Sequence, residues 1–390
     1  MAIPLSYNFR NLVERRTTTI MTALGIALTV AVMLGILGML AGLRASFQAT
    51  GHPLHLLVLR KGSTAELTSV VTQENLQVIR SKEGVQVENG EPMISQELVT
   101  VVNLKIRNSA EEAQANVNVR GLPQAGVHMR AETVKLSSGR WFAAGQRELT
   151  VGRGVAQTYE GIDIGKQIQI GRGYWTIVGV FDGGQTAFNG EIWTDGNQLA
   201  NDVGRPNALS SALLRAADPA AARTLAAAIA NDQRLSHEAV PELDYYLRQT
   251  ESGRPLQYLG IFVAVVMAIG SSFAAMNTMY AAVVRRSREI GVLRVLGFSR
   301  PSILLSFMIE SFLLSVLGGV VACLITLPFN GVSSRIGNQV TFSQTLFQFR
   351  VTPAMLAVGL TFAAIMGLFG GLLPARTAAR KDVVNALRDL

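Results

Sequence analysis

The sequence RRSREIGVLRVLGFSRPSILLSFMIE, residues 285–310, decides the fold of this 390-residue chain. It places five arginines between two long apolar segments. Apolar and charged residues lie at helical spacing, which predicts a short amphipathic helix. Gly297 and Pro301 are predicted to end this helix and to begin the next one. A basic segment next to apolar runs indicates on which side of a membrane it lies.

Four segments are long and apolar enough to cross a membrane. Residues 17–43, 255–284 and 351–375 contain no charged side chain, and residues 301–334 contain only Glu310. A bilayer core of roughly 30 Å requires about 20 apolar residues in a helix. A helix also satisfies its own backbone hydrogen bonds in lipid. We therefore predict a membrane protein with an α-helical four-span transmembrane domain.

Basic residues are concentrated in the segments that share one side of these spans. Residues 1–16, 285–300 and 376–390 together contain twelve basic and four acidic residues, whereas the rest of the chain contains equal numbers of each. Lys and Arg accumulate in cytoplasmic segments. Both termini of this multi-pass membrane protein are therefore predicted to be cytoplasmic. The net charge of +8 reports topology, and it gives little support to nucleic-acid binding.

The apolar run at 17–43 is longer than the core of a cleaved signal peptide, so it is predicted to remain as an anchor. The preceding segment is either an amphipathic interfacial helix begun by Pro4 or an ordinary charged flank. The predicted order is a cytoplasmic amphipathic helix at 1–16, transmembrane helices at 17–43, 255–284, 301–328 and 351–375, a cytoplasmic helix at 285–300, a short periplasmic loop at 329–350, and a cytoplasmic tail at 376–390.

A long polar segment, residues 44–254, separates the first two spans. Its mixed helix and strand patterns predict a bilobed α+β extracytoplasmic domain. The predicted elements are strands at 54–59 and 97–105, helices at 73–79 and 219–231, and a β-rich insertion at about 117–195 with a hairpin at Gly171. The loop at 329–350 is too short to carry another domain.

No catalytic motif in the inserted segment is convincing. His52 and His55 have i, i+3 spacing but lack further metal-ligand neighbours, so they are interpreted as surface histidines. The sequence GIDIGKQ, residues 161–167, has one residue too few between its glycines for a phosphate loop, and Gln167 stands where Ser or Thr would bind magnesium. It is predicted to be a turn. The chain is therefore expected to be a non-catalytic subunit that binds no cofactor or metal.

Several long segments carry a resemblance to one family. The sequence RRSREIGVLRVLGFSRPSILLSFMIESFLLSVLGG, followed by PARTAARKDVVNALR, closely resembles the FtsX-like domain of MacB-type ABC transporter permeases. NFRNLVERRTTTIMTALGIALTV resembles the start of these permeases. GRWFAAGQRELTVGRGVAQ and IGKQIQIGRGYWTIVGVF resemble their periplasmic domain. The resemblance covers nearly the whole chain. It implies a MacB/FtsX-type permease subunit, a multi-pass protein of the bacterial inner membrane.

The resemblance also implies partners. MacB itself carries a fused ATPase before its first span, whereas this sequence has only 16 residues there, so two copies of a separate ABC ATPase are expected to hold ATP and Mg. The permease is expected to act as a homodimer or paired permease, with a possible periplasmic adaptor and outer-membrane channel. ATP-driven closure would be transmitted through a cytoplasmic coupling helix. The residues assigned to this coupling are Arg285, Arg286, Arg288, Glu289, Ile290, Val292, Leu293, Arg294 and Gly297.

A charged residue and two glycine motifs within the spans invite functional interpretation. Glu310 lies nine residues past Pro301, roughly 13 Å into a helix, so it is a membrane-embedded ionisable group. It is either functional, or it reaches toward the interface or pairs with an arginine such as Arg286. The glycine pairs Gly38-x-x-x-Gly42 and Gly367-x-x-x-Gly371 permit close helix packing and are candidates for dimer contacts.

Three functions remain open from the sequence. The leading hypothesis is a permease that couples ATP hydrolysis to movement of its exterior domain, for export or extraction of a hydrophobic or peptide-like substrate. The alternative is an FtsX-like transmembrane regulator of a periplasmic cell-wall hydrolase. An ion-gradient transporter is disfavoured because the spans contain a single charged residue. The length of the insert and its resemblance to the MacB-type domain favour the first.

Overall fold

A computed structural model describes the chain at residues 10, 13–14, 16–109, 113–206, 208–250, 254–338 and 341–380. Most of the predicted helix at 1–16 and residues 381–390 of the predicted tail lie outside the described residues. The chain forms two compact units. The helical unit contains Met1–Ala41, Pro255–Val332 and Phe349–Leu390, and the inserted domain contains Gly42–Arg254 and Ser333–Gln348.

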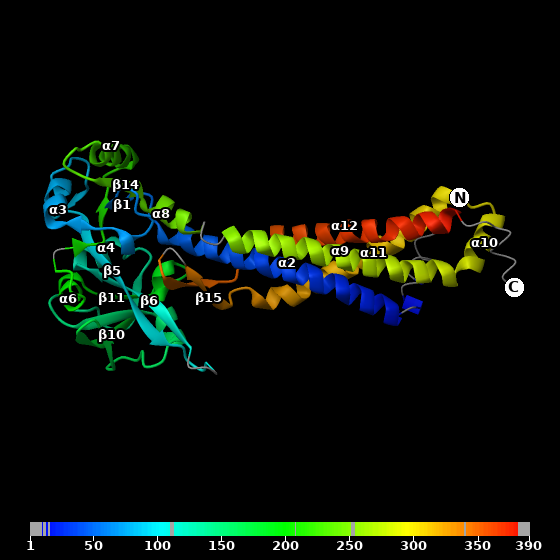
Figure 1. Cartoon of the computed structure of the whole chain (residues 1–390), viewed down its shortest axis with the longest axis horizontal. Helices are drawn as coiled ribbons and strands as arrows, with labels where there is room; N and C mark the ends of the chain where they lie inside the picture. Colours follow the sequence, from blue (N-terminus) through cyan, green and yellow to red (C-terminus); the bar gives the residue numbers. More distant parts are fainter. Residues whose placement is uncertain are drawn as a thin grey trace. The chain divides into compact units, whose positions relative to one another are not determined.

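In the described part of the chain, four helices are long and apolar enough to cross a membrane. They are α2 (Arg16–Thr50), α9 (Arg254–Arg285), α11 (Arg300–Thr326) and α12 (Pro353–Arg380), and Figure 1 shows them as long coiled ribbons. The predicted four-span helical architecture is thus confirmed. Helix α2 continues past the predicted limit of residue 43, because its last turns bury Phe47 and Ser46 within the inserted domain.

Small residues let these helices approach closely. A Cβ atom on Gly318 of α11 would lie 2.8 Å from the carbonyl oxygen of Ala23 in α2. A Cβ on Gly367 of α12 would lie 2.1 Å from Ser315 Oγ of α11, and Ser311 Oγ donates a hydrogen bond to the Gly367 carbonyl at 2.6 Å. Such approaches exclude any larger side chain.

The suggested role of the glycine pairs in dimer contacts is not what the structure shows for Gly367 and Gly371. Both pack against α11 of the same chain, and a Cβ atom on Gly371 would lie 2.5 Å from Ser311 Cβ. Gly38 likewise faces Phe349 and Met355 of its own helical unit. The sequence spacing correctly indicates close packing but does not identify the partner helix.

The inserted domain is built on one mixed sheet of ten strands. Its order is β14-β1-β13-β5-β6-β11-β8-β10-β7, with β9 paired to β10. The first half of the sheet comprises β1 (His55–Arg60), β5 (Ile94–Lys105), β6 (Gln114–Leu122), β13 (Ser211–Arg215) and β14 (His237–Pro241). The second half comprises β7 (Lys135–Gly139), β8 (Glu148–Gly152), β9 (Gln167–Ile170), β10 (Gly173–Asp182) and β11 (Glu191–Asp195).

Short strands and helices complete the domain. The short strands are β2 (Val71–Thr72), β3 (Val87–Glu88), β4 (Glu91–Pro92) and β12 (Ala208–Leu209). The helices are η1 (Glu66–Thr68), α3 (Gln73–Arg80), α4 (Gln124–Met129), α5 (Arg153–Thr158), η2 (Ala187–Gly190), α6 (Gly196–Asp202), α7 (Pro219–Ala230) and α8 (Glu242–Gln249). The elements expected at 54–59, 73–79, 97–105 and 219–231 all lie close to their predicted positions.

Two hydrophobic cores correspond to the two predicted lobes. One surrounds Trp175 and Leu149 in the β-rich part, and the other packs α3 and α7 on β1 and β13 through Leu76 and Ile229. Helix α7 begins where the sequence dictates, because Asp218 Oδ1 accepts hydrogen bonds from the backbone N–H groups of residues 220 and 221 at 2.7 and 2.8 Å. The α/β fold of the inserted domain is therefore confirmed, with both cores sharing one sheet.

The predicted short loop at 329–350 is wrong in one respect. After η4 (Leu327–Phe329) the chain forms a β-hairpin of β15 (Ser333–Asn338) and β16 (Ser343–Gln348), and this hairpin belongs to the inserted domain. Few apolar residues alternate in this segment, so periodicity gives little indication of strands. The inserted domain therefore includes two separate parts of the chain.

Candidate functional site

The candidate coupling segment forms a separate short helix, α10 (Ser287–Val295), between α9 and α11. Arg286 interrupts the helical backbone between α9 and α10, with φ −99° and ψ 16°. Glu289 lies in the first turn of α10 and Arg294 in its last turn. This placement of charges favours the helix dipole. The structure thus places a helix inside the predicted range 285–300.

Gly297 ends α10 in the way its sequence position predicts. It has φ +93°, a conformation that costs a residue with a side chain considerably more than glycine. The backbone N–H of Phe298 donates to the Leu293 carbonyl at 3.1 Å, and that of Gly297 donates to the Arg294 carbonyl at 3.2 Å. These two bonds form a Schellman motif. Pro301 then stands in the first turn of α11.

A buried ion pair joins this segment to α11. Arg286 Nη1 donates to Glu310 Oε2 at 2.7 Å, and both residues are 4% exposed. The Arg286 guanidinium also lies 5.9 Å from the ring centroid of Phe307 and 3.8 Å from Glu289 Oε2. Glu310 therefore pairs with Arg286, which is one of the alternatives considered for it from the sequence. It fixes the start of α10 against the third span.

The residues assigned to coupling divide into buried, half-buried and exposed groups. Ile290 is buried and packs with Met279, Val283 and Ile303, so it holds α10 to the helical unit. Arg286 is buried as well, whereas Leu293 and Arg294 are half-buried. The exposed residues of the assigned set are Arg285, Arg288, Glu289, Val292 and Gly297.

Two exposed apolar residues, Val295 and Leu296, are not among the coupling residues predicted from the sequence. Each is 63% exposed, beside Val292 at 49%. We call Val292, Val295 and Leu296 the apolar patch of α10. Their i, i+3 and i+4 spacing is readable in the sequence, but the spacing does not show which apolar residues the helical unit buries. Large apolar side chains grouped on a short charged helix indicate a contact surface.

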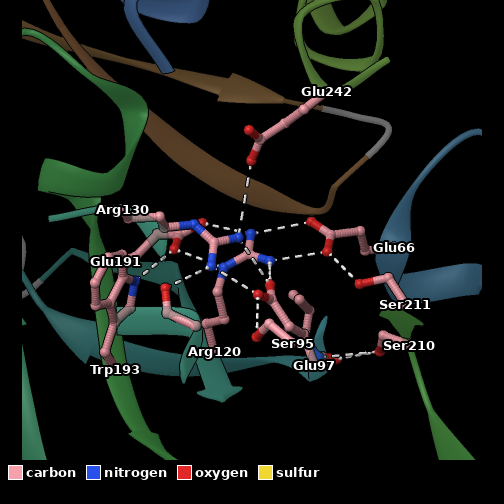
Figure 2. Close-up of polar contacts among 12 residues, drawn as sticks. Glu66, Ser95, Glu97, Arg120, Arg130, Glu191, Trp193, Ser210, Ser211 and Glu242 are labelled. Atoms are coloured by element: carbon pink, nitrogen blue, oxygen red, sulfur yellow. Dashed lines mark hydrogen bonds and ion pairs between the residues drawn. The ribbon is translucent and has the colours of Figure 1, made fainter. Parts of the chain in front are cut away.

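A second unusual site lies inside the inserted domain, where charged side chains form a buried cluster (Figure 2). Arg120 of β6 donates to Glu191 of β11 at 2.9 Å, to Glu66 of η1 at 2.8 Å and to Glu97 of β5 at 2.6 Å. Trp193 Nε1 donates to Glu191 at 2.8 Å, and Ser211 Oγ donates to Glu66 at 2.7 Å. Every carboxylate around Arg120 therefore has a second or third partner, which makes its burial tolerable.

The cluster extends to residues near two of the chain segments that join the inserted domain to the spans. Arg130 donates to Glu97 at 2.7 Å and lies 3.8 Å from Glu242, the first residue of α8. His55 Nδ1 lies 2.9 Å from Glu242 Oε2. The interpretation of His55 as a surface histidine is wrong, since it is 1% exposed. Its neighbour in the sequence motif, His52, is half-buried, and its backbone N–H donates to the same carboxylate at 3.1 Å.

The electrostatics of the cluster favour charged Glu97. Burial alone would raise the pKa of this carboxyl, but the guanidiniums of Arg130 and Arg120 outweigh it and lower the pKa to about 2. In the part of the chain that the structure describes, no group of three or more His, Cys, Asp or Glu side chains is arranged to hold a metal ion. The hydrogen bonds and ion pairs of the cluster hold strands and helices of the inserted domain together.

Breaking the Arg286–Glu310 pair tests its role in positioning α10. Glu310→Ala is expected to lower the free energy of unfolding by about 3–5 kcal/mol, because it leaves a buried guanidinium without its main partner. The double variant Arg286→Met/Glu310→Met is expected to recover most of this loss. Reversible unfolding of the detergent-solubilised protein measures both values. Equal losses in the single and double variants would contradict the assignment.

The Glu97 interaction predicts an acid dependence of stability. The pKa of Glu97 is lowered from its ordinary value to about 2 in the folded protein. The stabilisation is therefore fully present above the ordinary carboxyl pKa, and it is lost as the pH falls through the folded-state pKa. Stability should therefore decline between about pH 4.5 and 2. Glu97→Gln should flatten this decline, whereas Glu160→Gln, at an exposed residue, should leave it unchanged in thermal unfolding measured across that range. A decline of equal slope in Glu97→Gln rules out this cause.

Two protein-family models match this chain. A family model of the MacB-like periplasmic core domain matches residues 19–232, and one of the FtsX-like permease C-terminal segment matches residues 261–383. The ABC transporter permease YknZ of Bacillus subtilis, itself described as uncharacterised, is 24% identical over 403 residues, which cover 97% of this chain and 96% of YknZ.

Longer relatives and a solved structure are also similar. The macrolide export ATP-binding/permease protein MacB of Hahella chejuensis is 26% identical over 336 residues, which cover 78% of this chain and 47% of that protein. The chain thus spans about half the length of such relatives. The periplasmic region of MacB from Actinobacillus actinomycetemcomitans aligns with 50% of this chain and 91% of that structure, at 10% identity and a TM-score of 0.37. Since the core-domain family model covers more than half of the sequence, the chain belongs to the MacB/FtsX-type family of ABC transporter permeases.

Proposed function

We propose that this chain is the non-catalytic permease subunit of an ABC transporter, driven by ATP hydrolysis in a separate ATPase subunit. The observation that carries the proposal is the apolar patch of α10, Val292, Val295 and Leu296, exposed on a helix that Arg286 and Glu310 anchor to α11. An amphipathic helix with an exposed apolar face suits a hydrophobic groove in a partner. An anchored helix transmits the force of that partner to the span that follows it.

The charges around the apolar patch support the same proposal. Arg288 and Glu289 are exposed next to it, and Arg285 is exposed at the end of α9. Arginine and apolar anchors together are typical of residues that contribute most to protein–protein binding. ATP and Mg would be held by the ATPase, of which two copies would serve a homodimer or paired permease.

Orientation in the membrane follows from the distribution of basic residues. The segments at 1–16, 285–300 and 376–390 hold all of the excess positive charge. The positive-inside rule then puts α10 and both termini in the cytoplasm of a bacterial inner-membrane protein. The inserted domain lies on the opposite side in this proposal, in keeping with its match to a periplasmic core domain.

The proposed task is export or extraction of a hydrophobic or peptide-like substrate, with a possible periplasmic adaptor and outer-membrane channel. Relatives described as macrolide export proteins support this class of substrate. The match of the MacB-like core domain to residues 19–232 favours export over regulation of a cell-wall hydrolase. Capture of an adaptor by the inserted domain would support export, and capture of a hydrolase would support regulation.

The docking surface is tested by a substitution at one of its two most exposed residues. Val295→Asp places a carboxylate in the apolar patch and is expected to weaken ATPase binding roughly tenfold or more, as loss of a hot spot does. Co-purification of the ABC ATPase that accompanies the wild-type chain from native membranes provides the measurement, followed by titration of the purified subunits.

Val87→Asp is the matched control, because Val87 in the inserted domain has the same exposure as Val295, 63%. This control should bind the ATPase as the wild type does. Unaltered ATPase binding and ATP turnover in Val295→Asp would overturn the docking role of α10. Absence of any co-purifying ATPase with the wild-type chain would overturn the proposed function itself.

A further inference from the structure

The β15–β16 hairpin lies between α11 and α12 in the chain. Four residues separate α10 from α11, and only η4 and three residues separate the end of α11 from the start of β15. Four residues separate the end of β16 from α12. The hairpin strands pair along their whole length, from Ser333 with Gln348 to Asn338 with Ser343. The chain from α10 to the hairpin therefore consists of α11 with short connections at its two ends.

The side chain of Leu346 on β16 packs against two glycines, Gly154 and Gly190. A Cβ atom on Gly154 of α5 would lie 2.7 Å from Leu346 Cδ1, and one on Gly190 of η2 would lie 3.4 Å from Leu346 Cγ. The leucine side chain thus lies where a side chain on Gly154 would have to be. The neighbouring Phe347 is buried, at 4% exposed. The hairpin is packed onto the β-rich part of the inserted domain.

Polar contacts fix the hairpin along its length. Asn116 of β6 donates to the Phe342 carbonyl at 3.0 Å, Tyr159 Oη donates to Gln344 Oε1 at 3.4 Å, and Asn338 donates to Gln249 of α8 at 3.4 Å. The hairpin also borders a cavity of about 40 Å³ that Arg120 and Glu191 line. Its contacts therefore reach β6, α8 and the edge of the buried charge cluster.

The close approach of the hairpin to α2 adds a further constraint. A Cβ atom on Gly42 would lie 2.0 Å from the carbonyl oxygen of Gln348. Such a contact with backbone tolerates no side chain without movement of one of the two segments. The hairpin consequently contacts the C-terminal part of α2, the end of α8 that leads to α9, and the β-rich core.

We propose that the β15–β16 hairpin is the connection through which α11 and α12 move the β-rich part of the inserted domain, with Leu346 as its positioning residue. This inference rests on the proposed function, because it extends the path from an ATPase at α10 through α11. A loop that only linked two spans would need neither a fitted leucine nor hydrogen bonds to three elements of the domain. Packed contacts of this kind move as one body instead of deforming continuously.

Hydrogen exchange of the full complex with its co-purified ATPase tests the proposal. The wild type should show a change in exchange in β6 and β8 upon addition of a non-hydrolysable ATP analogue with Mg²⁺. Leu346→Asp should abolish that change and raise exchange in β15 and β16, while ATPase binding and basal ATP hydrolysis remain at the wild-type level. Leu346→Ala should reduce the change without abolishing it.

Phe342→Asp is the matched control in the same hairpin, since Phe342 is 60% exposed and its backbone contact to Asn116 survives the change. It should behave as the wild type. Retention of the nucleotide-dependent change in both Leu346 variants would overturn the role of the hairpin. Unchanged exchange protection of β11 in Leu346→Asp would show that the inserted domain is still folded. If β11 loses its protection as well, the loss of the nucleotide-dependent change counts against the proposal. A wild-type complex with no nucleotide-dependent change overturns the proposed function.

Discussion

The buried pair of Arg286 and Glu310 is the interaction on which the arrangement of the coupling segment depends. Two charges removed from water require good geometry and further partners. Arg286 and Glu310 share a 2.7 Å hydrogen bond, and Phe307 and Glu289 lie close to the guanidinium. The pair joins the junction of α9 and α10 to the first half of α11. In the proposed function, a force applied to the apolar patch of α10 would therefore act on α11.

The inserted domain uses the same physical device on a larger scale. Arg120 binds carboxylates from η1, β5 and β11, and Arg130 connects this group to Glu242 at the start of α8. Both hydrophobic cores share the sheet that carries these residues. Since an unpaired buried charge is costly, the cluster opposes separation of the two cores. The domain is suited to move as a unit when the hairpin or the span ends move.

Much of this organisation is predictable because it follows from local chemistry. Apolar runs indicate the four helices, Gly297 and Pro301 indicate the limits of α10, and β-branched segments indicate the main strands. Other features depend on residues that are distant in sequence, so no periodicity indicates them. These are the packing of Leu346 against two glycines and the Arg120 cluster. Arg120 offers a weak signal as an arginine within the otherwise apolar and amide-containing strand β6. His55 is misjudged from sequence because its partner, Glu242, lies far along the chain.

In the proposed function, α10 and the inserted domain lie on opposite sides of the membrane and are coupled across it. Single cysteines at Ser299 and Ser138, both exposed, test it most directly in a Cys323→Ala background, with a membrane-impermeant maleimide applied to intact right-side-out vesicles. Ser138→Cys should be labelled in intact vesicles, and Ser299→Cys should be labelled only after permeabilisation. Labelling of both sites before permeabilisation, or the reverse pattern, would contradict this arrangement.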